Sequence, residues 1–305
     1  MARHFVTDLD LSAEEQAQVL DLALKMKANP EEYRTALSGK ILGMIFAKNS
    51  TRTRVSFEAG IIQLGGQGIF LPSSSSQLGR GEPPSDTGQV LSRYLDFIMI
   101  RTFDNREVRE LAEASSVPVI NGLDDDYHPC QVLADLLTIK EKKGNLKGLQ
   151  LVYIGDGNNM AHSLMLGGAM AGMNVRIICP EGYRPKEGIV SSAQELGEKH
   201  GCTIEVTGDL EAVADADVVY TDVWASMGQE DESAKRIKAF AGYQVDVEMM
   251  NKAKVDAIFL HCLPAHRGEE VHADVIDGRW SVVFDEAENR MHAQKALMVF
   301  LAQNS

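Results

Sequence analysis

Short apolar runs recur along the chain, separated by longer segments whose apolar residues have helical spacing. In the first half, this pattern predicts strands at 41–46, 68–71, 96–100 and 117–120, and helices at 53–64 and 129–140. In the second half, it predicts strands at 150–154, 174–179, 203–206, 217–221 and 256–260. Runs such as Ala257–Leu260 are continuously apolar, which is typical of strands covered on both faces. The alternation therefore predicts an α/β fold with two doubly wound parallel sheets.

Segments outside these strands carry further signals. Ser12-Ala-Glu-Glu15 is a capping box and predicts that the first helix begins there. The charged segment Lys140–Gly148 contains two glycines and has no apolar face, so it predicts the boundary between two domains. Ser73–Ser76 lies in a segment rich in Gly and Pro up to Pro84 and predicts a flexible loop. From Glu288 the pattern is again helical.

The composition excludes several classes of protein. The 305 residues, 44% hydrophobic and 24% charged, are those of a globular protein with room for two domains. The net charge of −14 argues against nucleic acid as a partner, because phosphates need a basic surface. The apolar run Ile41–Ala47 is far shorter than the roughly 20 residues of a membrane span, and residues 1–10 lack the apolar core of a signal peptide. Four cysteines without close spacing indicate reduced thiols, so we expect a cytoplasmic protein.

Ligands of parallel sheets bind beyond the carboxyl ends of the strands, so the segments that follow the predicted strands are the candidates. Strand 41–46 leads into Lys48–Arg54, which holds three hydroxyls and three cations and opens a helix. A helix N-terminus favours an oxyanion; the simpler alternative is a capped helix with a solvated basic turn. Because these donors are dense in an acidic chain, we interpret the segment as a phosphate cradle. Strand 96–100 delivers Arg101 to the same edge.

A second polar segment, Asp124–Gln131, opens the helix that starts at Pro129. His128 and Gln131 are three residues apart and can face the same point across one turn. A histidine there can donate to a developing oxyanion, and a glutamine amide can bind a neighbouring amide. The alternative is a histidine at a helix start with no chemical role.

Two segments that follow predicted strands in the second half of the chain suit a polar ligand. Gly155–Asn159 follows a strand, but Met160 replaces the third glycine of a dinucleotide-binding motif. We therefore expect Asn159 to bind a polar ligand, and no nicotinamide cofactor. Asp222–Gly228 places a carboxylate and a small polar turn after strand 217–221, which suits an ammonium or amino-acid ligand, with a capped turn as the alternative.

The exit of strand 256–260 contains His261, Cys262 and His266. These side chains could ligate zinc, but His261 and Cys262 are adjacent and no second Cys/His pair stands at ligand spacing. We therefore expect no metal. A thiol beside cations can act on protons, which is the function we assign to Cys262.

Taken in order, these segments resemble the carbamoyltransferase family. Ser50-Thr-Arg-Thr-Arg54 resembles its carbamoyl-phosphate signature, and His128-Pro-Cys-Gln131 resembles its second motif. Asp222 with Ser226-Met227-Gly228, and His261-Cys-Leu-Pro264, resemble the ornithine branch. The resemblance runs from about residue 5 to the C-terminus, and the order of the motifs makes it far more specific than any one of them.

The resemblance implies transfer of a carbamoyl group from carbamoyl phosphate to the δ-amino group of L-ornithine, giving L-citrulline and phosphate. It implies a step of arginine biosynthesis that needs no cofactor. It further implies a carbamoyl-phosphate-binding domain at 1–143, completed by a C-terminal helix at 287–305 that packs back on it, and an ornithine-binding domain at 144–286.

The family roles map onto matching positions of this chain. The residues implied to be catalytic are Arg101, His128 and Cys262. Those implied to bind carbamoyl phosphate are Ser50, Thr51, Arg52, Thr53, Gln77, Arg101, His128, Pro129, Cys130, Gln131, Cys262, Leu263 and Arg290. Those implied to bind ornithine are Asn159, Asp222, Ser226 and Met227. The loop with Gln77 resembles one that family members lend to a neighbouring subunit, which implies a homotrimer with shared sites.

Related functions would leave different signatures. Aspartate as acceptor would need cations facing its carboxylates, acetylornithine lacks an α-ammonium for Asp222, and putrescine lacks both α-groups. A catalytically silent ligand-binding regulator could keep the phosphate cradle, but it would have no reason to keep Cys262 and His128 together. We therefore expect an enzyme with small-molecule substrates, and neither nucleic acid nor a membrane as a partner.

Overall fold

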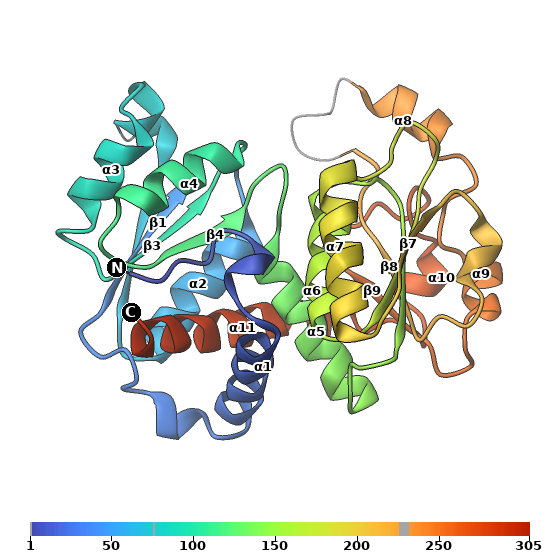
Figure 1. Cartoon of the computed structure of the whole chain (residues 1–305), viewed down its shortest axis with the longest axis horizontal. Helices are drawn as coiled ribbons and strands as arrows, with labels where there is room; N and C mark the ends of the chain where they lie inside the picture. The colour runs from blue at the N-terminus through green and yellow to red at the C-terminus, as the bar shows by residue number, and fades with distance from the viewer. Residues whose placement is uncertain (1, 76, 226–231) are drawn as a thin grey trace. The chain divides into compact units, whose positions relative to one another are not determined.

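The computed structural model describes residues 2–75, 77–225 and 232–305, which form two compact units (Figure 1). Unit 1 comprises Met1–Leu137 and Glu288–Ser305, and unit 2 comprises Thr138–Ala287. The chain first passes from unit 1 to unit 2 inside helix α5 (Pro129–Lys143), between Leu137 and Thr138, whereas the sequence predicts a boundary at 143/144. The helix continues to that point because nothing breaks it before Gly144, whose φ of +83° suits a glycine at a helix end. The chain returns to unit 1 inside helix α11 (Val283–Gln303).

Unit 1 is built on a four-stranded parallel sheet with the strand order β2-β1-β3-β4. Its strands are β1 (Ile41–Phe46), β2 (Gln67–Pro72), β3 (Phe97–Arg101) and β4 (Val119–Leu123). Its other helices are α1 (Ala13–Ala28), α2 (Thr51–Gln63), α3 (Pro84–Leu91) and α4 (Asn105–Ala114). Short 3₁₀ turns lie at Asp8–Asp10, Pro30–Tyr33, Ser73–Ser75 and Leu78–Arg80. The last two turns lie in the segment that the sequence predicts as a loop.

The core of unit 1 explains where its helices lie. On one face of the sheet, Val108 and Leu111 of α4 pack with Ile45, Ile98 and Ile100 of the strands. Helix α11 approaches α2 closely, because a Cβ on Gly60 would stand only 3.2 Å from Cγ of Lys295. The C-terminal helix therefore packs on the first unit, as predicted.

Unit 2 contains a five-stranded parallel sheet with the order β7-β6-β5-β8-β9. Its strands are β5 (Gln150–Ile154), β6 (Asn174–Ile178), β7 (Ile204–Thr207), β8 (Val218–Thr221) and β9 (Ile258–His261). Its helices are α6 (Asn159–Met170), α7 (Glu187–His200), α8 (Ser233–Ala239), α9 (Val247–Lys252), α10 (Ala273–Ile276) and the 3₁₀ turn Leu210–Val213. The prediction of two doubly wound parallel-sheet domains is confirmed.

The order of the strands decides where ligands can bind. In unit 1 the strand that follows β1 and the strand that follows β3 are added on opposite sides of this central pair, so the strand order reverses between β1 and β3. In unit 2 it reverses in the same way between β5 and β8. Such switch points leave a crevice at the carboxyl ends of the strands, because the flanking helices lie on opposite faces. Predicted polar segments follow β1 and β3 in unit 1 and β5 and β8 in unit 2, and two more follow the neighbouring strands β4 and β9. Among the described residues, no helix is both long and apolar enough to cross a membrane.

Candidate active site

In unit 1, the segment after β1 forms the N-terminus of α2. Ser50 is the N-cap, and its hydroxyl accepts a hydrogen bond from the backbone N–H of Thr53 at 3.1 Å. Thr51 is exposed, Arg52 is half-buried and Thr53 is buried. The first turn of α2 contains no acidic residue to offset the positive end of the helix. This end therefore keeps its attraction for an anion.

Thr53 joins two arginines from distant parts of the chain. Its hydroxyl accepts hydrogen bonds from Arg101 Nη1 at 3.3 Å and from Arg290 Nη2 at 3.2 Å. Arg290 Nη1 also donates to Oε1 of Gln131 at 2.5 Å, and Gln131 Nε2 donates to Asp135 at 2.7 Å. The structure thus brings together residues that the sequence predicts as parts of one phosphate site, and it fixes the orientation of the Gln131 amide.

His128 lies buried among these cations, with a relative exposure of 5%. Burial lowers its pKa well below the ordinary value, and Arg290, Arg101, Arg52 and Lys48 lower the pKa further. The ring is therefore neutral at pH 7, with one N–H donor and one acceptor nitrogen. A neutral histidine among cations suits an electrically negative ligand.

Asp124 holds the turn that precedes His128. Its Oδ1 accepts from the backbone N–H groups of Asp126 and Tyr127, and its Oδ2 accepts from Asn105 and Asn121, all at 2.7 Å. Burial raises the pKa of Asp124 to about 6, although these four donors oppose the shift. The carboxylate therefore fixes the backbone from which His128 projects.

Three further residues of unit 1 differ in their contacts. Pro129 begins α5, and the buried thiol of Cys130 donates to the carbonyl of Asn121 at 3.3 Å. Burial raises the pKa of Cys130 to about 12, so this thiol belongs to the core. Gln77 is exposed and lines an apolar hollow with Leu71 and Val90. The role predicted for Gln77 lies in the site of a neighbouring subunit, so it stays a prediction for a single chain.

The sequence analysis counts Lys48 among the three cations of the segment Lys48–Arg54 but assigns it no role of its own. Its side chain is buried, forms an ion pair with Asp125 and lies 4.4 Å from the ring centroid of Phe103. Burial of a lysine is uncommon unless its charge is paired, and that rule could have identified Lys48 if the fold were known. It adds one more positive charge beside His128.

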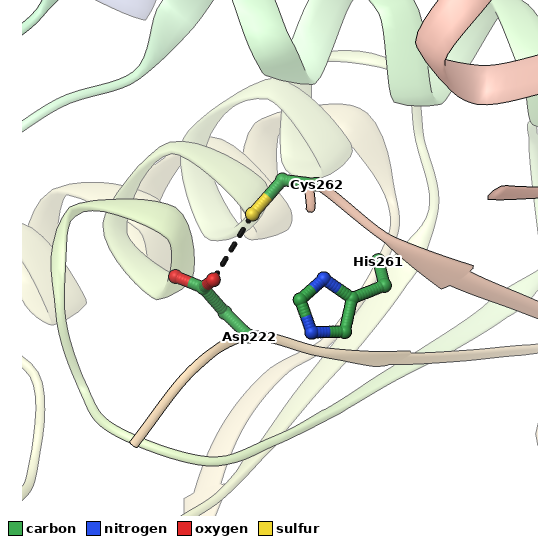
Figure 2. A group of neighbouring side chains, drawn as sticks. All are labelled: Asp222, His261 and Cys262. Atoms are coloured by element: carbon green, nitrogen blue, oxygen red, sulfur yellow. Dashed lines mark hydrogen bonds between the residues drawn. The ribbon is translucent and has the colours of Figure 1, made fainter. Parts of the chain in front are cut away.

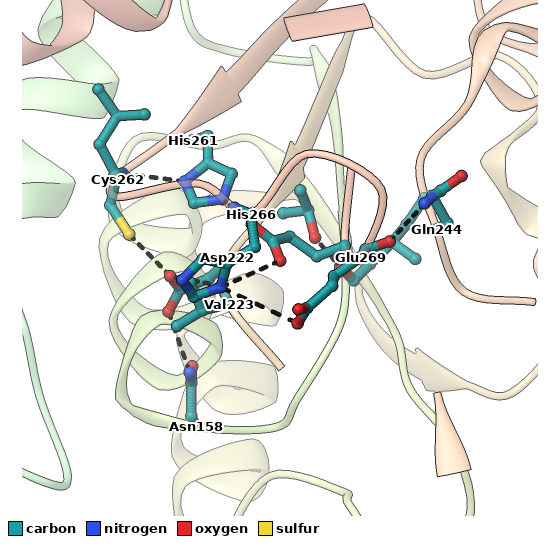
Figure 3. Close-up of polar contacts among 12 residues, drawn as sticks. Asn158, Asp222, Val223, Gln244, His261, Cys262, His266 and Glu269 are labelled. Carbon is teal, nitrogen blue, oxygen red and sulfur yellow. Dashed lines mark hydrogen bonds and ion pairs between the residues drawn. The ribbon is translucent and has the colours of Figure 1, made fainter. Parts of the chain in front are cut away.

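In unit 2, the predicted Asp222 and Cys262 meet at the ends of β8 and β9 (Figure 2). The Cys262 thiol donates to Oδ1 of Asp222 at 3.0 Å, and Asn158 Nδ2 donates to Oδ2 at 3.1 Å. Asn158, which the sequence analysis did not name, is the N-cap of α6 and contacts Asp222 (Figure 3), whereas the role of Asn159 stays a prediction. The preference for Asn at an N-cap was the signal that could have identified Asn158.

His261 fixes the turn that carries Cys262. Its Nδ1 accepts the backbone N–H of Leu263 at 2.9 Å, so Nε2 carries the hydrogen and donates to Oε1 of Glu270 at 3.1 Å. The backbone N–H of His261 donates to Glu286 at 2.9 Å, and Leu263 has a φ of +57°, which costs a non-glycine residue strain. The sequence did not predict that the buried carboxylates of Glu270 and Glu286 support this turn.

The ligand atoms of Asp222, His261 and Cys262 lie within 4.8 Å of one another, close enough to hold a metal ion. However, the thiol is bonded to the carboxylate, and the Nδ1 lone pair of His261 accepts from Leu263. Hydrogen bonds therefore account for this arrangement of the three side chains. The predicted Ser226 and Met227, with Gly228, lie outside the described residues.

The sequence models of one family match both units. Residues 3–141 match the carbamoyl-P binding domain of the aspartate/ornithine carbamoyltransferases, and residues 147–301 match their Asp/Orn binding domain. Both matched domains are those of enzymes that transfer a carbamoyl group. The chain belongs to the aspartate/ornithine carbamoyltransferase family.

Individual relatives agree with this assignment. The chain is 59% identical over 302 residues to an ornithine carbamoyltransferase of Oceanobacillus iheyensis, covering 98% of this chain and 94% of the relative. The structure of the Pyrococcus furiosus ornithine carbamoyltransferase has a TM-score of 0.94 and 51% identity, covering 97% of this chain and 96% of that one. The anabolic enzyme of Campylobacter jejuni has a TM-score of 0.94 and 42% identity, covering 99% and 100% of the two chains.

Proposed function

We propose that this chain is an ornithine carbamoyltransferase, which converts carbamoyl phosphate and L-ornithine to L-citrulline and phosphate. The observation that carries the proposal is the hydrogen-bonded set Asn158, Asp222 and Cys262 in a member of this family. A carboxylate flanked by a thiol and an amide suits an amine-bearing acceptor. Aspartate would need cations facing its carboxylates instead.

The phosphate of carbamoyl phosphate is proposed to bind at the N-terminus of α2. Backbone N–H groups and hydroxyls in the segment 50–53 would hold its oxygens, and Arg52 would balance its charge. Arg290 would complete the pocket, since its guanidinium already joins Thr53 and Gln131. The main chain at His128–Gln131 and the Gln131 side chain would orient the carbamoyl group.

The chemical step is attack of the δ-amine of ornithine on the carbamoyl carbon. Negative charge develops on the carbamoyl oxygen, where Arg101 and the neutral ring of His128 are proposed to donate hydrogen bonds. One such preorganised donor contributes about 10²–10³ in rate. Collapse of the intermediate breaks the C–O bond, and phosphate leaves as an anion that the cations of unit 1 stabilise.

The amine must lose a proton to attack, and its solution pKa is near 10, like that of lysine. Cys262 is proposed as the local proton acceptor in its thiolate form, after its thiol has lost to solvent the proton that it donates to Asp222. The main chain at Cys262 and Leu263 is proposed to contact the carbamoyl amide. Asp222 would bind the α-ammonium of ornithine together with Asn159, Ser226 and Met227. No electron is transferred and no oxidation state changes, so the proposed reaction requires no redox cofactor.

The test is citrulline formation in metal-free buffer with a chelator. Ornithine, aspartate, putrescine and N-acetylornithine would be compared as acceptors. We expect fast turnover with ornithine alone. Turnover with another acceptor instead would refute the assigned acceptor but keep the phosphate site, and silence with all four would support the alternative of a ligand-binding regulator.

We propose the homotrimer and the shared site on the family likeness of the loop with Gln77, whose side chain is exposed in this structure. Mixing chains with Gln77→Ala and chains with His128→Ala, each expected to have low activity, tests sharing directly, because a mixed trimer can form a site with both wild-type residues. Recovery of part of the wild-type activity in the mixture supports shared sites, whereas a mixture no more active than the two separate variants contradicts them. The domain limits 1–143 with 287–305 and 144–286 and the role in arginine synthesis are proposed on the likeness to the family. The cytoplasmic location is proposed on the four cysteines without close spacing.

A further inference from the structure

A second group of polar side chains lies on the turn that follows the His261–Leu263 segment. Nδ1 of His266 is 4.0 Å from Oε2 of Glu269 and 3.8 Å from Oε2 of Glu270 (Figure 3). The ligand atoms of the three residues lie within 4.8 Å of one another. His266 and Glu269 are about half exposed, so solvent ions reach the group.

Glu270 is the unusual member of this group. Its side chain is completely buried, and Oε1 accepts hydrogen bonds from His261 Nε2 and from the backbone N–H of His266. Oε2 is buried but has no hydrogen-bond partner among the described residues. A buried carboxylate oxygen without a partner costs free energy, and such atoms in native proteins normally have a protein group, a water or an ion beside them.

We propose that His266, Glu269 and Glu270 bind a divalent transition-metal ion of the Zn²⁺ type. One imidazole nitrogen and two carboxylate oxygens are ligands that such ions accept, with water completing the coordination. Ligand atoms around tetrahedral zinc are about 3.4 Å apart, by geometry from bonds of about 2.0–2.2 Å. The two distances from the imidazole, 3.8 and 4.0 Å, therefore need to close by only a few tenths of an ångström, and the two carboxylates lie within 4.8 Å of each other.

The surroundings favour a cation at this position. The nearby Arg267 does not neutralise the two carboxylates, because its guanidinium forms a two-bond ion pair with Asp277. The turn itself is held in place, since Gln244 Nε2 donates to the backbone carbonyl of Glu269 at 2.7 Å. An ion on Oε2 of Glu270 would leave both hydrogen bonds of Oε1 intact, so one carboxylate can serve the ion and His261 together.

The test uses Co²⁺ as a spectroscopic substitute for Zn²⁺ and the full chain with Cys262→Ala. This background removes the thiol of the Asp222–His261–Cys262 group, so that any remaining signal cannot come from a thiolate. We expect saturable binding of one ion per chain, with visible absorption typical of low-coordinate Co²⁺. Adding His266→Ala or Glu269→Gln should weaken binding roughly tenfold or more, since even indirect partners of ligands contribute about 10–100-fold.

His272→Asn is the matched control. His272 is also half exposed and lies 3.6 Å from a carboxylate oxygen of Asp274, and asparagine can keep its role as the N-cap of α10. This variant should bind Co²⁺ as before. Absence of saturable binding with Cys262→Ala, or equal binding after His266→Ala, would overturn the proposal. Neither outcome depends on catalysis, so failure of the metal proposal would not contradict the proposed function, which is tested by citrulline formation.

Discussion

The thiol of Cys262 donates a hydrogen bond to Oδ1 of Asp222 at 3.0 Å, across 40 positions of sequence. The two residues meet because β8 and β9 are neighbours in the parallel sheet and both end at the same edge. The thiol is half-buried while the carboxylate is buried, so an amine that reaches Asp222 also reaches the sulfur. This pairing leads to two predictions about the acceptor.

Cys262→Ala is expected to lower kcat by about 10²–10⁴, the usual contribution of a positioned proton acceptor. Cys262→Ser keeps a small polar group at hydrogen-bond distance from Asp222 and should retain more activity. Steady-state kinetics of both variants with ornithine provides the measurement. Equal kcat for wild type and Cys262→Ala would remove the thiol from proton transfer.

Asp222→Ala is expected to abolish ornithine binding, while the binding of carbamoyl phosphate in unit 1 stays unchanged. Hydrogen bonds between charged partners contribute about 1.5–3 kcal/mol, and the amide and thiol would also lose their acceptor. Calorimetry with each substrate separates the two effects. Asp217→Asn is the control, because Asp217 is a buried carboxylate just before the other end of β8. A loss of both substrates in Asp222→Ala would indicate a structural role.

Most of this site could be predicted because its signals are local. Continuous apolar runs mark buried parallel strands, and the residues directly after them must lie at one edge of the sheet. Thr53, Arg101, His128, Asp222 and Cys262 were all identified on this basis. The capping box at Ser12 likewise depends on neighbours in sequence, and both of its hydrogen bonds are present.

The features that were missed depend on tertiary contacts or on single positions. Glu270 and Glu286 are buried acids that both accept hydrogen bonds from His261 at the end of β9, and no sequence spacing reveals that pairing. Asn158 differs from the predicted Asn159 by one residue, which is enough to exchange a capping side chain for the first helical one. Pro84 begins α3, because proline suits the first turn of a helix although it also favours loops.

His128→Ala is expected to reduce kcat by about 10²–10³ while ornithine still binds, because the ring is one donor to the developing oxyanion. Substrate binding is measured by calorimetry and turnover by citrulline formation. His292→Gln serves as the control, since His292 is another buried histidine of unit 1 and pairs with Glu288. Unchanged turnover in His128→Ala would exclude the ring from the reaction.

The protonation of His128 gives a prediction for pH. Its pKa is well below 6.5 in the folded chain, mainly because of burial, so the ring should stay neutral when NMR follows it from pH 8 to 6. In the unfolded chain the ring binds a proton near pH 6.5, so the unfolded state binds more protons below that pH. The free energy of unfolding should therefore fall as the pH drops below about 6.5, and less so in His128→Gln. Protonation of the folded ring near pH 6.5 would contradict the prediction.

Arg290→Lys tests whether the geometry of the phosphate pocket matters beyond its charge. The guanidinium reaches Gln131 and Thr53 at the same time, at 2.5 and 3.2 Å, whereas a single ammonium cannot span both acceptors. We expect the KM for carbamoyl phosphate to rise by about tenfold or more, since one charge-assisted bond of about 1.5–3 kcal/mol is lost. The KM for ornithine should change little. Lys295→Met is the control, because Lys295 is a buried cation of the same helix that donates to Gln63. An unchanged KM for carbamoyl phosphate in Arg290→Lys would show that the charge alone suffices, and that Arg290 does not orient Gln131 for the reaction.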